Sequence, residues 1–170
     1  MLEPLPAPPR EPAIPRASLL APGGELSAAA IWMGGAQTAH GVPIDLHSVT
    51  AAWVIDCAGD MPPAFRAGAA RWFSRVFPDL DAVPPSLAAI RDLAREVADA
   101  LLRNDSVPAN LYVVCQHGMN RSGLVAGLVL RELGLQGAET VERIVTARPG
   151  SLSNQAFRHI VATGHGAPSL

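Results

Sequence analysis

Two residues near the middle of the chain have the types and the spacing needed for phosphate chemistry, Cys115 and Arg121. They flank a short loop that follows an apolar segment of strand type, 111–115, and precedes an apolar segment of helix type beginning at residue 124. A loop that ends at a helix N-terminus directs backbone N–H groups and the positive end of the helix dipole toward one point. This arrangement can hold a phosphate dianion, and it favours the thiolate form of a cysteine placed beside it.

The other residues of the loop fit the same chemistry. Gly118 allows a turn tight enough for its N–H to face the anion, and the hydroxyl of Ser122 can donate a hydrogen bond to the Cys115 sulfur. The guanidinium of Arg121 can bind two phosphate oxygens at once. A thiolate nucleophile and an arginine clamp need no metal ion or organic cofactor, and we expect neither. The predicted phosphate-binding residues are Gln116, His117, Gly118, Met119, Asn120 and Arg121.

The hydrophobic pattern around this loop predicts strands and helices in alternation. Strands are expected at 30–33, 52–56, 75–77 and 111–115, and Pro62-Pro63 could open a helix. Longer helices are expected from Pro84-Pro85 to about residue 103, at 124–133 and at 138–147, and Ser153 is expected to cap a last helix. The segment 111–115 is apolar on both faces, as in a central strand covered on both sides. The pattern indicates an α/β domain.

The composition narrows the class of protein. All 13 basic residues are arginine, which favours a GC-rich bacterial source, and the net charge of −2 argues against a nucleic-acid surface. No apolar run reaches the length of a membrane span, and the first residues, MLEPLPAPPREP, do not resemble a signal peptide. Two cysteines in such a chain suit a reducing compartment, so we expect a cytoplasmic protein without a membrane partner.

The loop also resembles a known family. The pattern Cys-x5-Arg-Ser, here Cys115 to Ser122, is similar to the signature of the cysteine-dependent protein-tyrosine phosphatase superfamily. Residues 31–35 (IWMGG) resemble the opening strand and glycine turn of its dual-specificity branch, and 147–157 (ARPGSLSNQAF) resemble a later Arg-Pro and Asn-x-x-Phe segment. The likeness covers about residues 26–162.

This resemblance implies a fold, a mechanism and a division of the chain. The fold would be α/β, with a central mixed, mostly parallel sheet and helices on both faces. The activity would be hydrolysis of a phosphomonoester, of the protein-tyrosine or dual-specificity type, through a phosphocysteine intermediate on Cys115. The chain would consist of a Pro-rich N-terminal tail, 1–24, and a phosphatase domain, 25–170.

The family uses an aspartate on a separate loop as general acid, and two residues here match that pattern. Phe77-Pro78-Asp79 resembles the Trp-Pro-Asp of tyrosine-specific phosphatases. Phe77-Pro78-x-x-Asp81 resembles the Pro-x-x-Asp of dual-specificity phosphatases, and this register continues into 84–90 as in the phosphatase and tensin homologue group. The sequence therefore favours Asp81, with Asp79 as the alternative.

One position departs from the family pattern, and another residue matches a family residue with a redox role. Val114 stands where the family usually has a histidine before the nucleophile, and His117 could partly compensate or could face the substrate. In the phosphatase and tensin homologue group, a cysteine in the context of Cys57 forms a reversible disulfide with the nucleophile. Here we favour a small buried residue at Cys57.

Other functions remain open on the sequence alone. The substrate could be a phosphorylated protein or a small phosphomonoester. The pattern Cys-x-His-Gly-x-Asn-Arg also resembles the loop of RNA 5′-triphosphatases of the capping-enzyme type, although the acidic net charge argues against an RNA partner. A non-catalytic phosphopeptide-binding module would keep the loop without turnover. A rhodanese-like sulfurtransferase fits less well, because its loop is typically one residue shorter.

Overall fold

The computed structural model describes residues 2–6, 14–103 and 106–166. Within these residues, one six-stranded sheet runs in the order β3-β1-β2-β6-β4-β5. Strands β2, β6, β4 and β5 are parallel, and β1 pairs antiparallel with both β2 and β3. The predicted mixed, mostly parallel sheet is confirmed. The strands are β1 (Arg16–Ala21), β2 (Ala30–Gly35), β3 (Val42–Pro43), β4 (Ala52–Asp56), β5 (Arg71–Ser74) and β6 (Asn110–Cys115).

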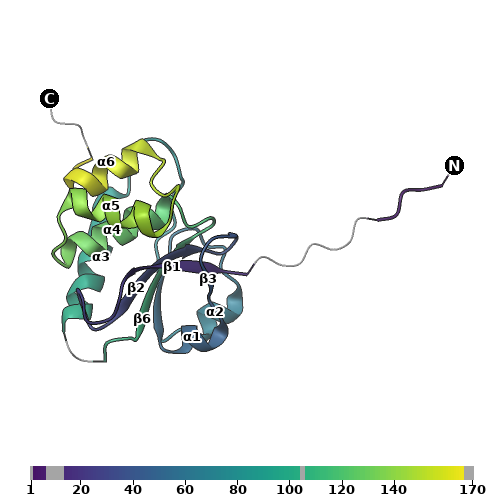
Figure 1. The fold of residues 1–170 in the computed structure, drawn as a ribbon, viewed down its shortest axis with the longest axis horizontal. Coiled ribbons are helices and arrows are strands. Elements are labelled where there is room, and N and C mark those ends of the chain that lie inside the picture. Colours follow the sequence, from purple (N-terminus) through teal and green to yellow (C-terminus); the bar gives the residue numbers. More distant parts are fainter. Residues whose placement is uncertain (1, 7–13, 104–105, 167–170) are drawn as a thin grey trace.

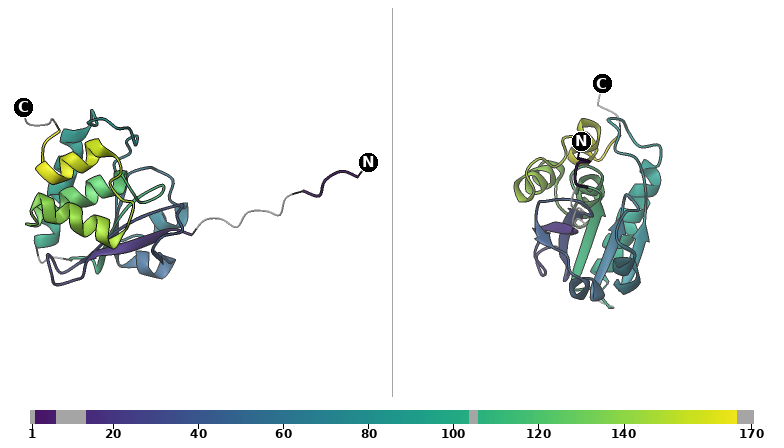
Figure 2. Two further views of the ribbon diagram at one scale, coloured as in Figure 1. Left: turned by 45° about the horizontal axis from the view of Figure 1, so that its top comes forward. Right: turned by 90° about the vertical axis from the view of Figure 1, so that its right-hand side faces the viewer.

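Helices cover both faces of this sheet, as predicted. The two short helices, α1 (Leu46–Thr50) and α2 (Pro63–Gly68), lie on one face. The four longer helices pack together on the other face, where they form the upper left part of Figure 1. The left view in Figure 2 shows the same separation of the two helical layers. The longer helices are α3 (Leu87–Leu102), α4 (Arg121–Glu132), α5 (Gly137–Ala147) and α6 (Gln155–Thr163).

The alternation of side chains along β6 divides the core into two parts. Leu111, Val113 and Cys115 belong to the large cluster under the four longer helices. Tyr112 and Val114 belong to a smaller cluster under α1 and α2. Because successive side chains point to opposite faces, a central strand buried on both sides must be apolar throughout. Each such side chain contributes about 1.5–3 kcal/mol on burial, so β6 holds the start of the Cys115 loop firmly.

Strand β1 differs from the sequence prediction, which placed 16–21 within the Pro-rich tail. Ala17 is fully buried and pairs with Gly34 of β2. A Cβ at Gly34 would lie 2.0 Å from the carbonyl oxygen of Arg16, so the two strands approach more closely than a side chain would permit. The boundary expected at residue 24, between tail and domain, therefore lies on the C-terminal side of β1, which is part of the sheet. Tail residues 1 and 7–13 lie outside the described residues.

The strand predicted at 75–77 is displaced by four residues. β5 covers Arg71–Ser74 because its register follows β4, with Trp53 opposite Arg71 and Asp56 opposite Ser74. Beyond that point two backbone hydrogen bonds follow without extending the strand, from the Arg75 N–H to the Asp56 carbonyl at 2.9 Å and from the Phe77 N–H to the Cys57 carbonyl at 3.4 Å. Phe77 is instead a core residue of the following loop, where its ring packs edge-on against a ring of α6.

Two predicted helix starts also shift by a residue or two. α3 begins at Leu87, after both prolines of 84–85, with Ser86 as its N-cap residue. α6 is capped by Asn154, whose Oδ1 accepts the N–H of Phe157, so the prediction of Ser153 as the cap is wrong. Asparagine is at least as good an N-cap as serine, and the sequence pattern alone does not separate neighbouring capping residues. Residues 104–105 of the loop predicted after α3 lie outside the described residues.

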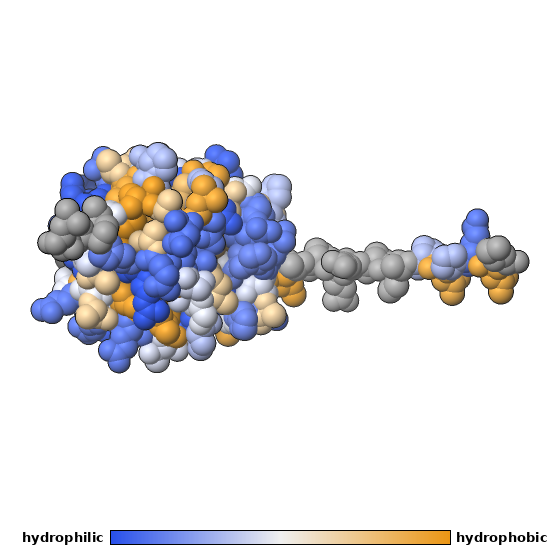
Figure 3. All heavy atoms as spheres, turned by 90° about the horizontal axis from the view of Figure 1, so that it is seen from above, coloured by the Kyte–Doolittle hydropathy of each residue, from blue (hydrophilic) through white to orange (hydrophobic). Residues whose placement is uncertain are grey.

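On the face shown in Figure 3, neither polar nor apolar side chains predominate. There, apolar side chains lie in patches between polar ones. Among the described residues, no helix has the length and apolar content needed to cross a bilayer.

Candidate active site

The loop between β6 and α4, residues 115–121, packs directly against the backbone of β2. Gly118 has a φ of +74°, in the left-handed region that side chains rarely adopt. A Cβ at Gly118 would lie 2.4 Å from the carbonyl carbon of Gly34, and a Cβ at Gly35 would lie 2.5 Å from the carbonyl oxygen of Gln116. Glycine is therefore required on both sides of this contact, which sets the shape of the loop.

Cys115 ends β6 with its side chain only 3 % exposed. Its Sγ accepts a hydrogen bond from the N–H of Gly118 at 3.2 Å and lies 3.3 Å from the hydroxyl of Ser122. Arg121 begins the 12-residue helix α4, so the sulfur also lies at the N-terminal end of that helix. N–H and O–H donors together with the helix dipole stabilise a thiolate at such a position.

A cavity of about 250 Å³ opens at the sulfur. It brings together Cys115, Arg121 and one of the two aspartates that the sequence predicted as general acid. The guanidinium of Arg121 lies at its wall, and Nη1 donates to the carbonyl of Phe77 at 3.4 Å. The volume corresponds to several water molecules, which is room for a phosphate group and part of the group that carries it. The lining residues are Asp79, Cys115, His117, Met119, Asn120, Arg121, Gly150 and Ser153.

The two candidate aspartates occupy different environments in the structure. Asp79 lines the cavity, and its two oxygens accept the side-chain amides of Asn120 and Asn154 at 3.0 and 2.8 Å. Asp81 is not among the lining residues, and its Oδ1 accepts the N–H of Ala156 in the first turn of α6. The residue that the sequence favoured thus contacts a helix terminus, whereas the alternative lines the cavity at Cys115.

A set of asparagines joins the aspartate loop to the phosphate loop. Asn154 is 8 % exposed, and its Nδ2 donates both to Asp79 and to the carbonyl of Leu80, at 2.8 Å each. The Oδ1 of Asn120 accepts the backbone N–H of Asn154 at 3.0 Å and the hydroxyl of Ser153 at 3.3 Å. Since Asn120 also lines the cavity, it belongs both to the predicted phosphate loop and to the support of Asp79.

The remaining predicted loop residues divide between the cavity and the scaffold. His117 and Met119 line the cavity, and Nδ1 of His117 lies 3.0 Å from the carbonyl of Gln37. Gln116 turns toward the same segment, with its carbonyl accepting the N–H of Gln37 at 2.7 Å. Val114 is fully buried in the apolar cluster beneath α1 and α2. The departure from histidine at this position is thus matched by an apolar environment.

Cys57 follows β4, the neighbour of β6 in the sheet, and is completely buried. Its backbone N–H donates to the carbonyl of Val114 at 2.8 Å, and both cysteines are free thiols. Burial is the main cause that raises the pKa of Cys57 well above its ordinary value. The charges of Cys115 and Asp56 act in the same direction, and Arg121 opposes them. Cys57 therefore remains protonated near neutral pH, as a small buried residue would.

Sequence reasoning assigned no role to two residues that the structure places at the site, Asn154 and Arg148. Asn154 stood within the segment resembling the family, but its contact with Asp79 spans 75 positions of the chain and leaves no local signal. Arg148 is 1 % exposed and donates to the carbonyls of His117 and Gly118. Its only sequence signal is the Arg-Pro pair at 148–149.

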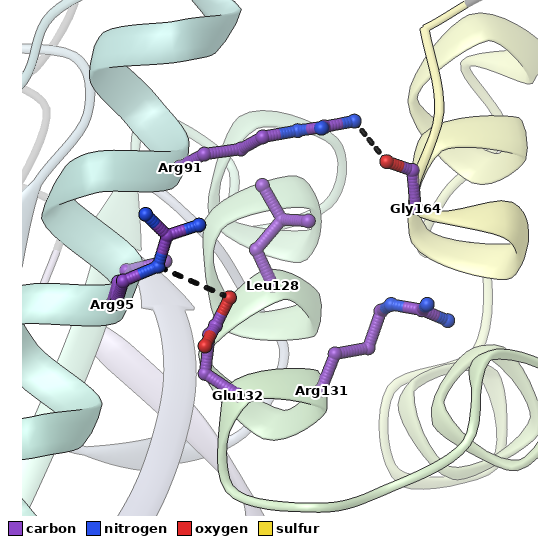
Figure 4. Close-up of a pocket in the computed structure, with 7 residues that line it drawn as sticks. Arg91, Arg95, Leu128, Arg131, Glu132 and Gly164 are labelled. Carbon is purple, nitrogen blue, oxygen red and sulfur yellow. Dashed lines mark hydrogen bonds and ion pairs between the residues drawn. The ribbon is translucent and has the colours of Figure 1, made fainter.

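A second cavity, of about 150 Å³, lies between α3, α4 and the end of α6 (Figure 4). Arg91 reaches from α3 to the carbonyl of Gly164, and Arg131 donates to two carbonyls in the last turn of α6. Arg95 faces Glu132 across the cavity. These cations neutralise the negative end of α6 and a carboxylate, so the cavity has a structural explanation. It shares no lining residue with the cavity at Cys115.

Comparison of the whole structure with solved structures identifies the fold as that of dual-specificity and tyrosine phosphatases. Human DUSP28 superposes with a TM-score of 0.62 at 19 % identity, over 94 % of this chain and 97 % of that one. The active form of Tk-PTP gives 0.60 at 17 %, over 89 % and 96 %. Kinase associated phosphatase, with its catalytic-site cysteine replaced by serine, gives 0.62 at 12 %, over 89 % and 94 %. No protein-family model and no curated protein matches the sequence.

Proposed function

We propose that this chain is a cysteine-dependent phosphatase that hydrolyses phosphomonoesters of the protein-tyrosine or dual-specificity type. One observation carries the proposal. The Cys115 sulfur, a helix N-terminus, the Arg121 guanidinium and the Asp79 carboxylate meet at one cavity of about 250 Å³. The phosphatase fold is consistent with this use of the cavity. The free thiols suit a reducing compartment such as the cytoplasm.

The first chemical step is attack of the Cys115 thiolate on phosphorus. A sulfur–phosphorus bond forms, the bond to the leaving oxygen breaks, and Asp79 gives that oxygen its proton. Each Asp79 oxygen accepts one amide, which leaves a lone pair free to carry this proton. Arg121 and the loop N–H groups bind the equatorial phosphate oxygens, over which the negative charge is spread in the transition state.

The second step returns the enzyme to its starting state. A water molecule attacks the phosphocysteine and transfers a proton to the Asp79 carboxylate, while the sulfur–phosphorus bond breaks. The hydroxyl of Ser122, 3.3 Å from the sulfur, donates a hydrogen bond to the departing thiolate of Cys115. Inorganic phosphate is released, and Asp79 is again protonated for the next substrate. Every group in this cycle is a side chain or a backbone N–H of the chain itself.

Hydrolysis of p-nitrophenyl phosphate in the presence of EDTA tests the proposal. We expect activity that Cys115→Ser abolishes. Asp79→Asn should lower kcat by about 10²-fold on phenyl phosphate, whose leaving group needs protonation, and by less on p-nitrophenyl phosphate. Asp81→Asn, the matched control, should stay within about twofold of wild type on both. The opposite order of the two variants would assign the acid to Asp81.

Complete inactivity of the wild type on these esters and on phosphopeptides would contradict the proposal. Protection of Cys115 from alkylation by a phosphopeptide, without turnover, would then identify a phosphopeptide-binding module. Hydrolysis of RNA 5′-triphosphate ends alone would assign the same cavity to the RNA-directed alternative. Among active outcomes, the relative kcat/KM for phosphotyrosine and phosphoserine peptides would define the substrate class.

A further inference from the structure

Arg148 is the largest fully buried side chain of the described residues, and it carries a positive charge. It follows α5, at the C-cap position of that helix. All five of its N–H donors are used, and none of the acceptors is a carboxylate. The acceptors are the Gly118 carbonyl at 2.6 Å, the His117 carbonyl at 3.1 Å, the Ser18 hydroxyl at 2.9 Å, the His40 carbonyl at 3.0 Å and the Thr38 hydroxyl at 3.0 Å.

A buried cation without a carboxylate partner destabilises the folded state, so the charge of Arg148 needs another source of stabilisation. Burial lowers the pKa of Arg148 from its ordinary value, and the negative charge of Cys115 acts in the opposite direction. A negative charge on Cys115 would thus favour the charged form of the guanidinium. Val114, the residue before the nucleophile, has no side-chain donor with which to support the loop from the strand side.

Peptide geometry connects the guanidinium to the reacting centre. In a trans peptide the C=O and the following N–H point in opposite directions. Arg148 Nη2 holds the His117 carbonyl, and the N–H of that same peptide group, on Gly118, donates to Cys115 Sγ at 3.2 Å. Arg148 Nε likewise holds the Gly118 carbonyl, so the N–H of Met119 is directed away from the guanidinium.

We infer that Arg148 is a positioning residue for the catalytic loop. It binds the outward carbonyls of two consecutive peptide groups and so turns their N–H groups toward the Cys115 sulfur and the bound phosphate. The planar fork is needed because one cation must reach two carbonyls in fixed directions. The inference rests on the proposed phosphatase function, and it adds a residue 33 positions beyond the nucleophile to the apparatus that binds the phosphate oxygens.

The test compares Arg148→Gln and Arg148→Lys with Arg158→Gln, which removes an exposed arginine of α6. Three quantities are measured at a temperature well below each thermal midpoint. They are kcat/KM on p-nitrophenyl phosphate, the rate of Cys115 alkylation by iodoacetamide followed by peptide mass spectrometry, and protection of Cys115 by inorganic phosphate. Alkylation reports thiolate formation, and protection reports oxyanion binding, without requiring turnover.

We expect Arg148→Gln to lower kcat/KM by about 10²-fold, the effect of losing one well-placed oxyanion donor. Cys115 alkylation at pH 6 should slow at least about fivefold, and phosphate should no longer protect it. Arg148→Lys keeps the charge without the fork, so it should lose about tenfold in kcat/KM. Arg158→Gln should match wild type within about twofold in all three measurements.

A folded Arg148→Gln protein with wild-type alkylation and phosphate protection would overturn the inference, even if its thermal midpoint were lower. If Arg148→Gln does not fold, the lysine variant decides. Wild-type kcat/KM and protection in that variant would show that the fork is not needed. If wild type has no turnover, protection of Cys115 that Arg148→Gln abolishes would still support the inference, while the proposed phosphatase function would fail.

Discussion

Replacing Asn154 with alanine should remove the hydrogen bonds that join Asp79 and Leu80 to the start of α6. Its Nδ2 donates to Asp79 and to the carbonyl of Leu80 at 2.8 Å each, and its Oδ1 caps α6 through the N–H of Phe157 at 3.1 Å. Loss of an N-cap costs about 1 kcal/mol, and each lost hydrogen bond costs about 1 kcal/mol. Because Asn154 is only 8 % exposed, water cannot readily replace these bonds. We therefore expect the free energy of unfolding to fall by about 3 kcal/mol.

Urea unfolding followed by circular dichroism measures this loss. The neighbouring Ser153→Ala removes only the exposed contact with Asn120 at 3.3 Å, so it should cost less than about 0.5 kcal/mol. A double-mutant cycle of Asn154→Ala with Asp79→Ala should give a coupling of about 1 kcal/mol. A loss of only about 1 kcal/mol for Asn154→Ala, together with no coupling, would mean that only the cap exists in solution and would refute the proposed link to Asp79.

Three further predictions concern single residues. Iodoacetamide should label Cys115 much faster than Cys57 near neutral pH, because burial raises the pKa of Cys57; equal labelling of the two peptides would contradict this. The N–H of Ser48, which donates to the Asp45 carboxylate at the start of α1, lowers the pKa of that carboxyl. The stability that Asp45 adds relative to the Asp45→Asn variant should therefore be complete above pH 3.8 and disappear as the pH falls through the folded-state pKa. A difference between the two melting temperatures that stays constant across this pH range would contradict the reasoning. Gly118→Ala should destabilise the fold by about 1–3 kcal/mol and abolish phosphate protection of Cys115, since its Cβ would meet β2; a variant with wild-type melting and protection would exclude that contact.

The parts of the site that lie close together in the chain could be predicted from the sequence. Cys115, Gly118 and Arg121 are neighbours in one strand–loop–helix unit, so their spacing alone defines their geometry. Strand β6 could also be predicted, because its continuous apolar pattern permits only a central position in the sheet. These predictions depend on local geometry, which short segments of sequence record directly.

Contacts between distant segments could not be predicted in the same way. Asp79 and Asp81 are two positions apart in a loop without regular structure, and the choice between them depends on Asn120 and Asn154, 41 and 75 positions away. The place of β5 depends on its register with β4 rather than on its own composition. In the sequence, Arg148 cannot be distinguished from an exposed arginine at a helix end, because its burial depends on contacts with distant segments.

Strand β1 lies far from Cys115 in the sequence, yet it defines where the smallest intact unit must begin. Ser18 supplies one of the acceptors of Arg148, and Ala17 packs where β2 has no side chain, at Gly34. A chain shortened to residue 25 would expose the edge of β2 and leave one donor of the buried guanidinium without its partner. Removal of residues up to 15 spares all of these contacts. The loop that begins at Cys115 therefore depends, through Arg148, on Ser18, which lies 97 positions earlier (115 − 18), and a fragment meant to keep this loop intact has to include β1.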